Sequence, residues 1–182
     1  MNDHDTRAWL LAWRDEEYDL AYDSAIENLE GKAFGVEEVV QVLRWKLVKL
    51  WPKRAEAAFR NANDDQLVRS TTARAFAAPP SLALQTVCSL KGIGPVVGSA
   101  VLMAHSPRLF TVMDVRALAS LRALSLLPSG DARPSARSWF RIWPDYLDAS
   151  IHLARELGLD LRAVDQGLWA AKGRMAPPSS AT

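Results

Sequence analysis

The stretch that decides the fold is Leu90-Lys91-Gly92-Ile93-Gly94-Pro95-Val96-Val97-Gly98-Ser99-Ala100. Gly92 and Gly94 can adopt backbone angles that residues with a Cβ rarely take, so one helix can end and another begin within about four residues. Pro95 suits the first position of the second helix, where no backbone N–H is needed. The stretch therefore predicts a helix over 81–90, a tight turn, and a helix over 95–105.

A turn of this kind leaves several backbone N–H groups unpaired at the positive end of a helix. Such a helix end is a binding site for phosphate. The arrangement is that of a helix-hairpin-helix, which binds a DNA backbone without reading its sequence. We expect Lys91 and the amides of Gly92, Gly94 and Val96 to hold a phosphate group.

With the loop Ser106-Pro107-Arg108 and with Asp114 opening the next helix, the turn resembles the DNA glycosylase superfamily of endonuclease III. This is the helix-hairpin-helix/Gly-Pro-Asp (HhH-GPD) superfamily. The resemblance covers roughly residues 82–121, and a weaker similarity at 164–169 resembles the last helix of the same fold. It implies an all-α, two-lobed fold, with the catalytic aspartate of the family at Asp114.

The resemblance also implies a reaction, which is hydrolysis of the N-glycosidic bond of a damaged or mismatched base. A carboxylate at Asp114 would stabilise the positive charge that grows on the sugar and orient the attacking water. Families with lyase activity carry a nucleophilic Lys at the position of Val96, so we expect a monofunctional enzyme without AP-lyase activity, with an amine from Lys46 or Lys91 as the alternative. Val115 and Arg116 depart from the family, in which His or Asn often follows the aspartate.

The rest of the chain shows mostly helical patterns. We expect a single domain over residues 1–174, followed by a disordered tail at 175–182. One lobe, residues 36–126, would contain the hairpin, and residues 1–35 with 127–174 would form the other. Further helices are predicted at 5–13, 16–29, 36–50, 66–77, 114–126, 135–143 and 144–158, with a last one that Asp160 caps and that ends near Gly173.

Residues 44–60 hold six basic side chains with Trp45 and Trp51 between them, a composition that suits a strand of nucleic acid. A solvent-exposed cationic face with tryptophans in the core is the alternative. In the resembled fold the corresponding helix approaches the damaged strand, so Arg44, Trp45 and Lys46 are candidate DNA contacts. The residues of this region are Arg44, Trp45, Lys46, Lys49, Trp51, Lys53, Arg54 and Arg60.

Composition limits the remaining possibilities. The 182 residues carry a net charge of only +1, so any grip on nucleic acid must come from local clusters. Cys88 is the single cysteine, which excludes an internal disulfide and a four-cysteine iron–sulfur cluster. No histidine pair has the spacing of a metal site, and no apolar run is long enough for a membrane span. We expect a monomeric, cytoplasmic, nucleoid-associated protein without cofactor or metal, whose partner is double-stranded DNA with a lesion or mismatch.

Two other functions fit the same stretch. If residues 86–90 and 109–113 were strands, Gly92, Gly94 and Gly98 would form a phosphate turn of a small nucleotide-binding enzyme, although the last glycine is one residue late for that fingerprint. The other alternative keeps the helix-hairpin-helix as a non-catalytic DNA-binding protein. Asp114 would then be only a helix N-cap, a very common role for aspartate.

Overall fold

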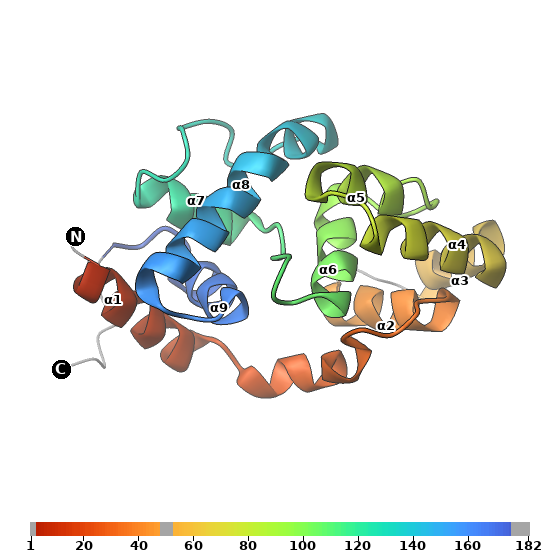
Figure 1. Ribbon diagram of the computed structural model, residues 1–182, viewed down its shortest axis with the longest axis horizontal. Coiled ribbons are helices and arrows are strands. Elements are labelled where there is room, and N and C mark those ends of the chain that lie inside the picture. The colour runs from red at the N-terminus through yellow and green to blue at the C-terminus, as the bar shows by residue number, and fades with distance from the viewer. Residues whose placement is uncertain (1–2, 48–52, 176–182) are drawn as a thin grey trace. The chain divides into compact units, whose positions relative to one another are not determined.

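The computed structural model describes residues 3–47 and 53–175, and within these ranges every regular element is a helix and no strand is formed (Figure 1). The predicted all-α class is therefore confirmed. A nucleotide site on a parallel sheet would need strands at 86–90 and 109–113. Helix α5 (Pro80–Val87) occupies the start of the first segment, and the second is a turn followed by irregular chain, so the described residues provide no sheet.

The chain divides into two compact units. The turn unit comprises Leu20–Val112, and the aspartate unit comprises Met1–Asp19 with Met113–Thr182. The sequence analysis placed residues 20–35 with the second lobe and residues 113–126 with the hairpin. In the structure, residues 20–35 belong to the turn unit, which contains the hairpin, and residues 113–126 belong to the aspartate unit. The glycines at 92 and 94 thus lie in one unit and Asp114 lies in the other.

The turn unit is built around helix α6 (Pro95–His105), on which α2, α4 and α5 pack. Every residue of α6 from Val97 to Ala104 is buried. Gly98 allows α5 to come close, because a Cβ there would lie 2.7 Å from the Sγ of Cys88. The other elements are η1 (Leu20–Ala25), η2 (Glu27–Leu29), α2 (Val36–Lys46), α3 (Lys53–Ala62) and α4 (Asp65–Phe76).

The aspartate unit brings the first and last helices of the described chain together. Helix α9 (Leu161–Ala171) packs against α1 (Asp3–Glu17), α7 (Val115–Ala123) and α8 (Ala136–Leu157) (Figure 1). Beyond α9 the guanidinium of Arg174 lies over the ring of Trp13, 3.6 Å from its centroid, and the carbonyl of Arg174 accepts a hydrogen bond from Trp9 Nε1 at 3.0 Å. These contacts hold the end of the described chain against α1.

Two helix predictions are wrong. The predicted helix over 16–29 does not form, because α1 continues to Glu17 and the chain then crosses into the turn unit, where short 3₁₀ helices follow. The predicted break at Pro144 is also absent, since α8 runs through it. Pro144 lacks an N–H to donate to the carbonyl of Phe140. A continuous buried stripe offsets this loss: Trp139, Trp143, Tyr146, Leu147, Ser150, Leu153, Ala154 and Leu157.

The smaller differences concern helix ends. Helix α5 begins after Pro79 and not at Ser81, and α7 ends at Ala123, short of the predicted 126. Asp160 precedes α9 as its N-cap but makes no side-chain capping bond. The end of the predicted helix over 36–50 and most of the predicted disordered tail lie outside the described residues.

The contact between α1 and α9 depends on Gly167, and its replacement by alanine tests the packing. A Cβ at this position would lie 2.7 Å from the backbone oxygen of Leu10. We expect Gly167→Ala to lower the free energy of unfolding by about 1–3 kcal/mol, because one helix must move away from the other. Urea unfolding measures the change. Gly94→Ala is the matched control, since no atom lies within 4 Å of its added Cβ, and equal losses in both variants would contradict the prediction.

Candidate functional site

The glycine turn, residues 90–95, joins α5 to α6. Gly92 has φ +85°, a left-handed conformation that glycine adopts without strain. Gly94 is extended, with φ −88° and ψ 171°. The amide of Ile93 donates a hydrogen bond to the carbonyl of Leu90 at 3.2 Å, which closes the turn. The Ile93 side chain is only 5% exposed and packs in the core. The predicted helix–turn–helix is therefore present, and Gly92 is the residue that makes the turn possible.

The backbone amides of this turn are available to a ligand. The amide of Gly98 bonds the carbonyl of Gly94 at 2.8 Å, and no side chain caps α6. Helix geometry leaves the amide of Val96, in the first turn of α6, without an intrahelical acceptor. Among the described residues, the amides of Gly92 and Gly94 make no hydrogen bond either. Because Gly92, Gly94 and Lys91 are exposed, the four predicted phosphate-binding residues lie together at a positive helix end.

The buried side chain of Asn63 fixes the glycine turn by hydrogen bonds to its backbone. Its side-chain amide donates to the carbonyl of Lys91 at 3.0 Å, and its side-chain oxygen accepts from the Lys91 amide at 3.0 Å. A further bond reaches the carbonyl of Phe59 at 2.9 Å, and the side chain is only 1% exposed. The sequence analysis did not find this role. The signal in the sequence was an Asn beside Asp64, which predicts a helix cap, and Asp64 is indeed the residue that caps α4.

Asp114 is the N-cap of α7 in the aspartate unit. Its Oδ1 accepts a hydrogen bond from the amide of Arg116 at 2.9 Å, and its carbonyl accepts from the amide of Leu118 at 2.9 Å. The carboxylate is half-buried. A capping role is thus part of the structure, and this role fixes one carboxylate oxygen against the start of the helix.

Aromatic and basic side chains surround the start of α7 within the same unit. The exposed Arg116 lies over the ring of Trp169, with its guanidinium carbon 4.4 Å from the ring centroid. Tyr18 meets Trp169 edge to face, with 5.6 Å between centroids. Trp169 is half-buried, whereas Trp139 and Trp143 are buried.

The basic region of the turn unit contains more ion pairs than the sequence suggests. Arg44 makes two hydrogen bonds to Glu56, at 2.9 and 2.6 Å, and Arg60 bonds both Glu56 and Glu37. Hydrogen bonds from Arg44 and then Arg60 lower the pKa of Glu56, so this carboxylate stays charged beside both cations. Arg44 would therefore have to share its guanidinium with any phosphate.

The other residues of this region are placed as follows. The Trp45 ring is 5% exposed and belongs to the core, so it offers no surface to DNA in this conformation. Lys46 is half-buried at the end of α2. Lys49 and Trp51 lie outside the described residues, as do the side chains of Lys53 and Arg54.

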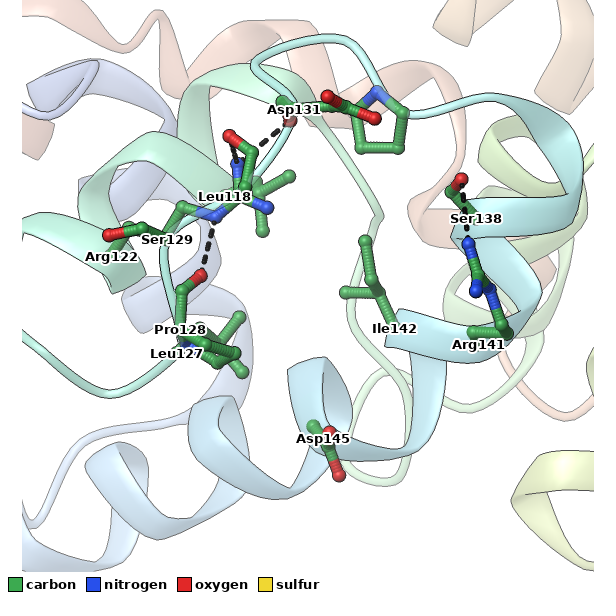
Figure 2. A pocket seen from close by; sticks show the side chains of 12 residues that line it. Leu118, Arg122, Leu127, Pro128, Ser129, Asp131, Ser138, Arg141, Ile142 and Asp145 are labelled. Carbon is green, nitrogen blue, oxygen red and sulfur yellow. Dashed lines mark hydrogen bonds between the residues drawn. The ribbon is translucent and has the colours of Figure 1, made fainter.

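A cavity of about 280 Å³ lies elsewhere in the aspartate unit, between α7, the loop over 127–134 and the first turns of α8 (Figure 2). Arg122 reaches across to the loop and donates to the carbonyls of Pro128 at 3.0 Å, Gly130 at 3.2 Å and Asp131 at 2.8 Å. Its guanidinium therefore holds the loop. Leu118, Leu127 and Ile142 line the apolar part of the cavity.

Cys88 is half-buried at the end of α5, and desolvation raises the pKa of its thiol to about 12, so the thiol keeps its proton at neutral pH. Among the described residues, no three His, Cys, Asp or Glu side chains lie close enough to hold a metal ion. In the same part of the chain, no helix has the length and apolar character to cross a membrane. Comparison of the chain with protein-family models, curated proteins and solved structures found no match.

The two hydrogen bonds between the Asn63 side chain and the backbone of Lys91 lead to a prediction about the glycine turn. Asn63→Ala removes three hydrogen bonds and leaves backbone groups of the turn without partners, so we expect unfolding free energy to fall by about 1–3 kcal/mol. The Lys91 amide should also exchange with solvent faster, which NMR measures. Asp64→Ala, which removes the neighbouring α4 cap, is the control: it should destabilise the protein without changing the exchange of Lys91. Equal effects on Lys91 in the two variants would mean that Asn63 has no special role.

Proposed function

We propose that this protein is a DNA glycosylase of the helix-hairpin-helix type, which removes a damaged or mismatched base by hydrolysis. The observation that carries the proposal is the glycine turn, where exposed amides at a helix N-terminus adjoin the exposed side chain of Lys91. Backbone amides bind phosphate oxygens whatever the base, so such a turn suits a protein that scans DNA for lesions. The resemblance of residues 82–121 to the endonuclease III superfamily supports the same function.

Gly94 adds a second argument for a ligand at the turn. Its backbone is extended, a conformation open to any residue, and no atom lies within 4 Å of a Cβ built on it. Backbone strain and packing in the free protein do not require glycine here, although glycine is a better N-cap for α6 than alanine. Glycine at such a position suits the close approach of another molecule, because a side chain would stand in front of the amides of Gly94 and Val96.

Asp114 is the catalytic group of the proposal. Water attacks the sugar C1′, the bond to the base breaks, and the base leaves with the electron pair and takes up a proton. The Asp114 carboxylate stabilises the positive charge on the sugar and accepts the proton of the water. Val96 provides no amine for a Schiff base, so the product is an abasic site with an intact strand.

Contacts to the DNA are assigned first to Lys91 and the turn amides. Arg44 and Lys46 stay candidates for the flanking phosphates, with Arg44 weakened by its pairing to Glu56. Trp45 is left out of the proposed surface because its ring is in the core. A non-catalytic DNA-binding protein is the second candidate, and the capping bond of Asp114 favours it, since that bond alone gives the aspartate a structural use.

The turn is tested by Gly94→Ala. We expect this variant to stay folded, with a loss of at most about 1 kcal/mol at the N-cap of α6, but to bind duplex DNA about tenfold or more weakly, because the methyl group blocks the approach of the phosphate to the amides. Fluorescence anisotropy at several salt concentrations measures the affinity, and Lys91→Ala should lower the slope of log K against log salt by about one. Ser89→Ala, at an exposed residue just before the turn, is the control. Wild-type affinity in Gly94→Ala would exclude the turn as the phosphate site.

The chemistry is tested by Asp114→Asn. Asparagine caps a helix about as well as aspartate, so the variant keeps the start of α7 and loses only the charge. We expect unchanged stability and DNA affinity, with base release slowed by about 10² or more. The assay uses duplexes with alkylated, oxidised, deaminated or mispaired bases. Asp64→Asn, the same change at the N-cap of α4, is the matched control. If the wild type binds DNA and releases no base from any of these duplexes, the binding protein is the correct alternative.

A further inference from the structure

Tyr146 is a fully buried polar residue for which the proposed reaction has no use so far. It lies on the buried face of α8 with 0% of its surface exposed. A hydrogen bond from the backbone of Asp114 reaches its hydroxyl, and the carboxylates of Asp114 and Asp165 both act on it electrostatically. Burial, and then these two negative charges, raise the pKa of Tyr146, so the hydroxyl keeps its proton.

The ring of Tyr146 fills space in the core, but its buried hydroxyl must have a different role. A phenylalanine would fill the same space, and a buried hydroxyl stabilises a protein only through the hydrogen bonds that it makes. The surroundings of Asp165 are themselves fixed. Asp165 is 3% exposed and forms an ion pair with Arg162, which also donates to the hydroxyl of Tyr18 at 2.6 Å. The charge that acts on Tyr146 from Asp165 is thus half of a largely buried ion pair.

Asp114 is held at three points. Its backbone bonds the Tyr146 hydroxyl, its Oδ1 accepts from the amide of Arg116 at 2.9 Å, and its carbonyl accepts from the amide of Leu118 at 2.9 Å. The last two bonds are part of the helix start and would occur at any N-cap. The bond to Tyr146 comes from another helix, so it ties the first residue of the α7 segment to α8.

We propose that Tyr146 is a positioning residue for Asp114: its buried hydroxyl fixes the backbone from which the carboxylate projects. This inference rests on the proposed function, in which the carboxylate must already be oriented when charge develops on the sugar. Because Tyr146 is completely buried, it acts through Asp114 and not by contact with DNA. Loss of the hydroxyl should therefore affect the rate of base release and spare DNA binding.

The experiment compares Tyr146→Phe with Ser150→Ala. Both remove one buried hydroxyl from the same face of α8, and within residues 3–47 and 53–175 the Ser150 hydroxyl donates only to the carbonyl of Tyr146, at 2.8 Å. Amide hydrogen exchange at Asp114, followed by NMR, reports on the bond directly. Single-turnover base release, with whichever lesion duplex the wild type processes, and DNA affinity report on its consequence.

In Tyr146→Phe we expect amide exchange at Asp114 to accelerate about tenfold and base release to slow about tenfold, with DNA affinity unchanged. Ser150→Ala should leave all three quantities as in the wild type. Unchanged exchange at Asp114 in Tyr146→Phe, or faster exchange with an unchanged rate of base release, would overturn the inference. A wild type that releases no base refutes the proposed function, and the exchange rates then still decide whether Tyr146 holds Asp114, so the two failures are distinguishable.

Discussion

The left-handed backbone of Gly92 is the constraint on which the turn unit depends. A φ of +85° at Gly92 turns the chain between the end of α5 at Val87 and the start of α6 at Pro95, and the first amides of α6 have no intrahelical acceptor. The buried side chain of Asn63 holds the same turn by both backbone groups of Lys91. A conformation that only glycine adopts easily and two hydrogen bonds from Asn63, in the bend between α3 and α4, together hold the turn in one shape, which would lower the ordering cost of the proposed phosphate binding.

The sequence predicted those features whose physical cause is local. The pair Gly94 and Pro95 marks the start of α6, and its end at 105 agrees with the expected range. Asp114 is the residue at which α7 begins, as expected, because an aspartate before an apolar run satisfies the amides of the first turn. The all-α class follows from helical periodicity along most of the chain, which a prediction can use without knowledge of tertiary contacts.

What the sequence did not reveal depends on distant partners. Asn63 and Lys91 are 28 positions apart, and no local pattern indicates that they meet. The pairing of Arg44 with Glu56 turns what seems a free cation into half of an ion pair. Pro144 misled because a local rule, that proline ends helices, is outweighed by the burial of a stripe of aromatic and aliphatic side chains along α8. The division into units likewise reflects packing and not composition.

The capping role of Asp114 is usually taken as the rival of a catalytic role, but the two requirements agree here. A carboxylate stabilises a developing charge best when its orientation is set before the reaction, so that nothing has to reorganise. The hydrogen bond from the Arg116 amide to Oδ1 sets that orientation, and because the amide is neutral it does not cancel the negative charge of the carboxylate. An asparagine would give the helix nearly the same cap. The cap thus explains why the side chain is held, and the proposed chemistry explains why a negative charge is useful at this position.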